Sequence, residues 1–159
     1  MLQTIVYSGA MRTLLVLSLA AASIAAADTG VPATYKTEAE LIKALAAGAT
    51  TPDMLTAEVQ NTNRHRVNVV RRTKAAGAVA HEGFAELHHI MDGSGTLVTG
   101  GTIVRPPGGR GSGPATIDGG ISRRVAKGDV VLVPSGVPHW YKDLDGAAIT
   151  YLEVRWEEK

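Results

Sequence analysis

The segment Phe84–Met91 (FAELHHIM) places two histidines and a glutamate in a short run that is otherwise mostly hydrophobic. Its alternation predicts a β-strand with Glu86 and His88 on one face and His89 on the other. Alternate residues of a strand are about 6.6 Å apart, so Glu86 and His88 can converge on one point, which His81 can also reach. Because a buried glutamate is costly unless a cation or a proton balances it, this strand favours a fold that holds a divalent metal inside.

Short segments with strand patterns follow one another from residue 57 onward. Turns rich in Gly, Pro, Asn and Asp separate them, and residues 106–120 are expected to form a flexible loop or an extended hairpin tip. The expected strands cover residues 57–60, 66–73, 84–91, 96–104, 121–126, 130–133 and 148–156, with another beginning at His139. About eight short strands at regular spacing predict an all-β sandwich or barrel.

The N-terminus has the pattern of a secretory signal peptide. An apolar run, Leu14–Ala26, leads to three alanines before Asp28, which offer a cleavage site of the A-x-A type. The run is shorter than the roughly 20 apolar residues that a membrane span needs. We therefore predict a signal peptide at residues 1–27, a mature protein that is periplasmic or secreted, and no membrane contact after cleavage. The alternative is an uncleaved anchor helix.

A short helix is expected between the signal peptide and the strands. Thr37 and Glu40 have the spacing of a capping box, and Gly48 is a natural stop after the last apolar residues. We expect this helix to pack against the outside of the barrel. The domain prediction is an N-terminal extension at residues 28–56, followed by the barrel domain at residues 57–159.

The composition restricts both the partners and the metal ligands. The chain has 159 residues, enough for one domain with one core, and a formal net charge of +1, which gives no electrostatic footprint for nucleic acid. It contains no cysteine, so disulfides and thiolate metal sites are excluded. Any metal must be held by histidines and carboxylates, a mixture that suits Zn, Fe(II), Mn, Ni or Cu without selecting one.

A second cluster of motif residues lies around the segment PSGVPHW. Gly128, Pro134, Gly136 and His139 match the pattern G-x5-P-x-G-x2-H-x3-N in residue type and spacing, and only the final Asn is replaced, by Asp143. This pattern is the second motif of the cupin superfamily, which the chain resembles from about Arg66 to Glu153.

The first cupin motif, G-x5-H-x-H-x3,4-E-x6-G, is matched in part. His81, Glu86 and Gly93 fit its second His, its Glu and its closing Gly. Val79 stands where the first His belongs, and Thr73 where the leading Gly belongs. The three His and one Glu usual in the family therefore become two His and one Glu.

The resemblance implies a single cupin-type double-stranded β-helix, a jelly-roll barrel, with one divalent transition metal at its mouth. The predicted ligands are His81, Glu86 and His139, with His88 restoring the count from the same strand face as Glu86. Glu86 and Tyr141 are the candidate groups for proton transfer, and Tyr141 is alternatively a pocket wall. The rival interpretation is a cupin that has lost its metal at Val79 and kept only a pocket.

Two classes of function stay open at this point. One is a metal-dependent enzyme of the dioxygenase, lyase or isomerase type, which acts on a small oxygenated molecule in the barrel. The other is a non-catalytic module that binds a small molecule, with or without a metal. Cupins commonly pair through an edge strand, so the resemblance also implies a homodimer.

Overall fold

The computed structural model describes residues 33–51, 53–108 and 112–158. The predicted signal peptide, residues 1–27, lies outside this range. Within it, no helix is both long enough and apolar enough to cross a membrane.

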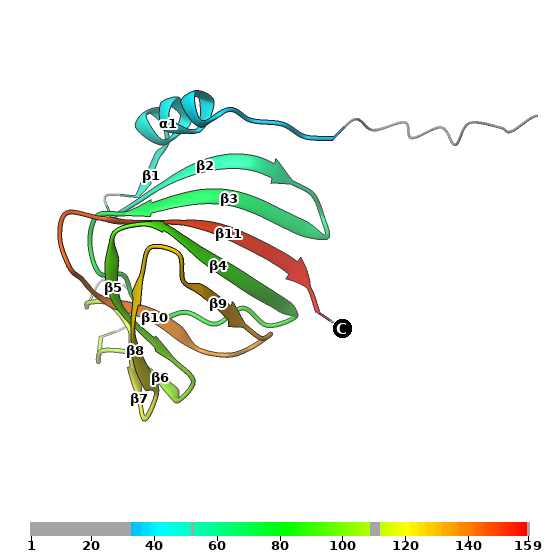
Figure 1. Ribbon diagram of the computed structural model, residues 1–159. Helices are drawn as coiled ribbons and strands as arrows, with labels where there is room; N and C mark the ends of the chain where they lie inside the picture. Colours follow the sequence, from blue (N-terminus) through cyan, green and yellow to red (C-terminus); the bar gives the residue numbers. More distant parts are fainter. Residues whose placement is uncertain (1–32, 52, 109–111, 159) are drawn as a thin grey trace, which may run out of the picture. The chain divides into compact units, whose positions relative to one another are not determined.

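Two antiparallel sheets make up most of the described chain (Figure 1). The larger sheet has six strands in the order β1 (Ala49–Thr51), β2 (Met54–Asn61), β3 (His65–Arg72), β11 (Ile149–Glu157), β4 (Phe84–Asp92) and β9 (Val130–Val133). The smaller sheet has the order β10 (His139–Leu144), β5 (Ser94–Thr99) and β8 (Ile121–Ala126). A separate hairpin pairs β6 (Thr102–Val104) with β7 (Thr116–Asp118).

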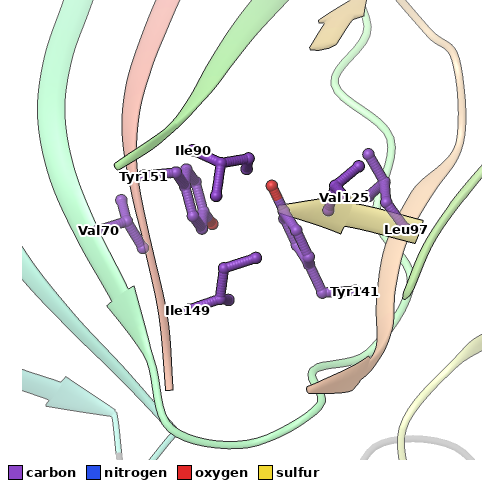
Figure 2. Packing of buried hydrophobic residues seen from close by; sticks show 7 residues of the cluster. All are labelled: Val70, Ile90, Leu97, Val125, Tyr141, Ile149 and Tyr151. Atoms are coloured by element: carbon purple, nitrogen blue, oxygen red, sulfur yellow. The ribbon is translucent and has the colours of Figure 1, made fainter. Parts of the chain in front are cut away.

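The core lies between the two sheets (Figure 2). Each sheet turns one row of side chains inward, as period-two alternation requires of strands that face each other. The larger sheet supplies Val70, Ile90, Ile149 and Tyr151, and the smaller sheet supplies Leu97, Val125 and Tyr141. The expected all-β architecture is therefore confirmed.

The predicted helix is present as α1 (Glu38–Ala47) and lies against β2 and β3 of the larger sheet. Its capping box is formed: the Thr37 hydroxyl accepts from the Glu40 backbone N–H at 3.2 Å, and the Glu40 carboxylate accepts from the Thr37 N–H at 2.7 Å. The Gly48 N–H donates to the Ala44 carbonyl at 2.8 Å, which closes the last turn.

The prediction of one continuous strand at residues 96–104 is wrong. The structure has two strands there, β5 and β6, separated by Gly100 and Gly101. Gly100 and Gly101 have φ angles of 73° and 72°, a left-handed conformation that favours glycine. A Cβ at Gly101 would lie 2.3 Å from the Asp118 carbonyl oxygen. The backbone therefore turns sharply after β5 into the β6–β7 hairpin, which contains part of the segment expected to form a hairpin tip.

Candidate metal centre

Strand β4 directs its acidic and basic side chains into the barrel as its alternation predicts. Glu86 and His88 are 1% and 2% exposed, whereas His89, the residue that follows them, faces solvent. The pairing of β4 with β11 on one side and β9 on the other holds this register. The sheet therefore buries two ionisable groups side by side.

Strand β11 lies between β3 and β4, and its pairing arranges the interior in layers. Each inward residue of β11 faces one inward residue of each neighbouring strand. From the more exposed end inward, the layers are Arg66–Arg155–Glu86, Asn68–Glu153–His88 and Val70–Tyr151–Ile90. The layers therefore run from two arginines and a glutamate at the exposed end, through a polar layer, to a layer around Tyr151, whose hydroxyl accepts from Arg72 Nε at 2.9 Å.

Two loops bring the remaining histidines to the charged end. Val79 and His139 exchange backbone hydrogen bonds of 3.1 and 2.9 Å, which place the start of β10 beside the approach to β4. The Gly136 N–H donates to the His81 carbonyl at 3.1 Å, so the Pro-Gly turn of the second motif also fixes His81. Val79, at the position of the missing motif histidine, is 37% exposed.

The imidazoles converge on the carboxylate of Glu86. His81 Nε2 lies 3.3 Å from Oε1, and both His88 Nε2 and His139 Nε2 lie 3.2 Å from Oε2. Two ligand atoms that are each about 2.1 Å from one metal ion are roughly 3.0–3.4 Å apart in octahedral or tetrahedral geometry. The spacing and the mixed nitrogen–oxygen chemistry therefore fit a divalent transition metal.

The four predicted ligands are not all equivalent. The ligand atoms of His81, Glu86 and His139 lie within 4.8 Å of one another, and so do those of Glu86, His88 and Glu153. Glu86 belongs to both groups and links them. His88 thus lies on the inner side of the first group, next to Glu153.

Sequence reasoning missed Arg155 and Glu153. The Arg155 Nη2 forms an ion pair with Glu86 Oε1 and donates to His81 Nε2 at 3.0 Å. Glu153 Oε1 lies 3.9 Å from the same Nη2. The only sequence signal was the last strand itself, in which ionisable residues alternate with apolar ones. A guanidinium, which sequence reasoning did not consider, therefore balances the buried carboxylate in the described structure.

The charges of the site are set by its contacts. Burial disfavours the ionised form of Glu86, but the contacts from His139 and His88 and the charge of Arg155 outweigh it and hold the Glu86 pKa far below its ordinary value of 4.5. Burial lowers the His81 pKa from 6.5; Glu86 opposes this shift, while Arg155 reinforces it. An ionised Glu86 and a neutral His81 are the protonation states that a metal requires.

Tyr141 faces inward with His139, as predicted. Its hydroxyl lies 3.0 Å from His88 Nδ1, and His88 Nε2 faces Glu86. Burial, reinforced by Tyr151, raises the Tyr141 pKa well above its ordinary value, so Tyr141 is a donor. The consistent assignment is that the Tyr141 O–H donates to His88 Nδ1 and that His88 Nε2–H donates to Glu86. This buried chain of hydrogen bonds fixes the tautomer of His88 and the orientation of the Glu86 carboxylate.

A cavity of about 460 Å³ lies next to the charged end of the barrel. His65, Arg66, His81 and Arg155 are among the residues that line it. A second cavity, of about 420 Å³, shares Arg66 and Arg155 and extends to Glu153. His81 and Arg155, which both contact Glu86, therefore line space that a small molecule can fill.

The stability of the metal-free protein is expected to fall with decreasing pH. The His81 pKa is lower in the folded than in the unfolded chain, so the contribution of His81 to the free energy of unfolding is lost as pH falls below about 6.5. The Glu86 pKa is also lower in the folded chain, and the contribution of Glu86 is lost as pH falls below about 4.5. Thermal melting between pH 8 and pH 3 in the presence of a chelator measures this. Glu86→Gln should remove the decrease in melting temperature below pH 4.5 that is due to protonation of Glu86. An unchanged melting temperature between pH 8 and pH 5 would contradict the expectation for His81.

No protein-family model matches the chain, and no curated protein matches it. Solved structures do match. A predicted oxalate decarboxylase from Thermotoga maritima has 18% identity and a TM-score of 0.50, over 66% of this chain and 81% of that chain. A protein from Thermus thermophilus has 16% identity and a TM-score of 0.51, over 80% of this chain and 100% of that one. A cupin superfamily protein from Desulfitobacterium hafniense has 14% identity and a TM-score of 0.43, over 72% and 89% of the two chains.

At these identities the comparisons inform on the fold. The two antiparallel sheets, the core between them and the turn that carries His139 agree with what the second motif implied. The chain therefore has the cupin fold, an all-β double-stranded β-helix preceded by a short helix.

Proposed function

We propose that this protein is a metal-dependent cupin that binds a small oxygenated molecule beside the metal and acts on it as a dioxygenase, lyase or isomerase. The observation that carries the proposal is the convergence of His81 and His139 on the ionised, buried carboxylate of Glu86. A site of two imidazoles and one carboxylate leaves coordination positions open for a ligand.

His81, Glu86 and His139 are the proposed ligands. His88, the fourth candidate from the sequence, could ligate only after losing the Nε2 proton that it donates to Glu86. When bound, the metal would supply Lewis acidity or, if it is iron, dioxygen activation. His139 is 5% exposed and Glu86 is 1% exposed, so both side chains enter the site with little freedom left to lose on binding. This preorganisation supports a resident metal at this position.

Glu86 and Tyr141 remain the candidates for proton transfer. They are joined by the hydrogen-bond chain through His88, whose two nitrogens face one group each. In the assigned tautomer this chain of hydrogen bonds runs toward the carboxylate, because Tyr141 donates to His88 and His88 donates to Glu86. Tyr141, at the far end of this chain of hydrogen bonds, is 2% exposed.

The charges that line the neighbouring cavity favour a ligand whose oxygen atoms carry negative charge. Arg66 and Arg155 lie opposite each other on β3 and β11, and both line the cavity. Like charges directly opposite on neighbouring strands are destabilising, and a small anion between them would relieve the repulsion. Planar guanidinium groups suit carboxylates in particular.

One observation favours the second candidate, a binding module without a metal. Arg155 already balances Glu86 and occupies His81 Nε2. In that case the pocket would hold its ligand through hydrogen bonds and arginine alone, and Val79 would mark a metal site that has been lost.

The experiment that separates the two is metal analysis of the mature protein, purified without a histidine tag. Elemental mass spectrometry should find about one equivalent of a transition metal, and chelation should lower the melting temperature, because a ligand that binds only the folded state adds to its stability. A protein that contains no metal, and that none of Zn²⁺, Mn²⁺, Fe²⁺, Ni²⁺ or Cu²⁺ stabilises, would overturn the metal-dependent function.

We also propose that the mature protein is periplasmic or secreted and forms a homodimer, with no nucleic-acid partner. The outermost strand β9 supports the dimer, because its Val130 and Leu132 are each 60% exposed. A second copy that pairs along this edge would extend the sheet and place its own side chains beside Val130 and Leu132.

A further inference from the structure

Arg155 and a metal ion would need the same atoms. The Nη2 group donates to His81 Nε2 at 3.0 Å and pairs with Glu86 Oε1. A guanidinium has only donors, so His81 Nε2 must be the acceptor in this hydrogen bond. An imidazole nitrogen has one lone pair in the plane of its ring, and it cannot accept from Arg155 and ligate a metal at the same time.

We propose that Arg155 is an internal competitor of the metal, and that metal binding transfers its guanidinium from Glu86 to Glu153. The inference rests on the proposed function, since it requires a metal at His81, Glu86 and His139. It assigns positioning roles to two residues: Arg155 holds the site in a balanced state without metal, and Glu153 receives the displaced charge.

Glu153 is placed to receive the guanidinium. It lies two residues before Arg155 on the same inward face of β11, and its Oε1 is already 3.9 Å from Nη2. Its other contact is a long hydrogen bond of 3.5 Å from the Asn68 amide. The side chain is 12% exposed, so this carboxylate is mostly buried and weakly paired. A short shift of Arg155 would give it a full ion pair.

In its present position, the guanidinium of Arg155 also does not form all of its possible hydrogen bonds. Its Nε is buried and has no hydrogen-bond partner within the described part of the chain. A buried donor without a partner carries a desolvation cost, which lowers the free energy needed to move the group elsewhere. The guanidinium is therefore held at one end only, by the two atoms that the metal would take.

The inference predicts that substitutions of Arg155 and of Glu153 change metal affinity in opposite directions. Arg155→Met removes the competitor and should tighten Zn²⁺ binding by about 10- to 100-fold, the range expected for hydrogen bonds to a charged group. Glu153→Gln removes the receiving charge and should weaken Zn²⁺ binding several-fold. Arg66→Met is the matched control, because it removes the same charge from the same layer, one strand further from Glu86. Its effect should be much smaller than that of Arg155→Met.

Zn²⁺ affinity would be measured on the full mature chain by competition with a chromophoric chelator, and the melting temperature of each metal-free variant would be measured in parallel. Metal-free Arg155→Met should melt below the wild type, because Glu86 has then lost its counter-charge.

Three outcomes would contradict the inference. If the Arg155→Met variant binds Zn²⁺ no more tightly than the wild type, Arg155 is not a competitor, although the metal site itself would stand. Zn²⁺ binding unaffected by Glu153→Gln would overturn the role of Glu153. Absence of metal binding in both the wild type and Arg155→Met would overturn the proposed function as well.

Discussion

His139→Ala is expected to abolish stoichiometric metal binding. The imidazole of His139 is 5% exposed, and its Nε2 lies 3.2 Å from the Glu86 carboxylate, so its removal leaves a buried gap in the proposed ligand set. Loss of an orienting partner alone typically costs 10- to 100-fold in metal affinity, so loss of a ligand should cost on the order of 100-fold or more. At a metal concentration near 100 times the wild-type dissociation constant, the variant should also lose about 2.3–2.7 kcal/mol of metal-dependent stabilisation.

The matched control for this prediction is His89→Ala. His89 lies on the same strand as Glu86 and His88 but on its exposed face. Its substitution should leave the metal content and the melting temperature unchanged. Equal metal content in the wild type, His89→Ala and His139→Ala, determined by elemental mass spectrometry, would mean that His139 is not a ligand. A loss of metal in both variants would point to adventitious binding by surface histidines.

Gly93→Ala is expected to be among the most destabilising single substitutions in the chain. Gly93 has a φ of 77°, and a Cβ there would lie 2.3 Å from the Ala148 carbonyl oxygen and 3.1 Å from the Ile149 Cα. The left-handed conformation costs about 1–2 kcal/mol with a side chain, and forcing atoms into a packed site costs typically about 1–3 kcal/mol more. The free energy of unfolding should therefore fall by about 2–5 kcal/mol in urea denaturation. This close approach is a physical reason for the closing glycine of the first motif.

Gly83→Ala provides the control, because it separates backbone strain from steric overlap. Gly83 has the same φ of 77°, but no atom of the described chain lies within 4 Å of the position of a Cβ. Its substitution should cost only the conformational part, about 1–2 kcal/mol. If the two variants lose equal stability, the overlap with Ala148 is not the cause of the effect at Gly93.

The inward and outward faces of β4 were predictable because alternation is a local property. Glu86, His88 and His89 lie close together in the sequence, and their burial follows from the pleat of one strand. The turn that carries His139 was also predictable, since its Pro and Gly residues have fixed conformational preferences. The capping box at Thr37 and Glu40 is a third local pattern, and it formed as expected.

The break of the predicted strand at Gly100 required the structure. The segment after it has β-favouring residues, and glycines alone do not tell whether a strand bends or ends. Its end is decided by the close approach of Gly101 to the Asp118 carbonyl, which belongs to the hairpin partner. That contact does not exist until the hairpin has formed.

The sequence by itself determined the all-β class, the helix with its cap, and the side of β4 that carries Glu86 and His88. Each of these depends on residues a few positions apart, whose geometry is set by backbone sterics and hydrogen bonding. Only the tertiary structure decided what balances Glu86. Arg155 meets His81 across 74 residues of sequence, through the register of β11 against β4. A shift of one residue would turn Arg155 out of the barrel, because side chains alternate between the faces of a sheet. The competition between this guanidinium and a metal is therefore a property of strand pairing, which no local pattern in the chain encodes.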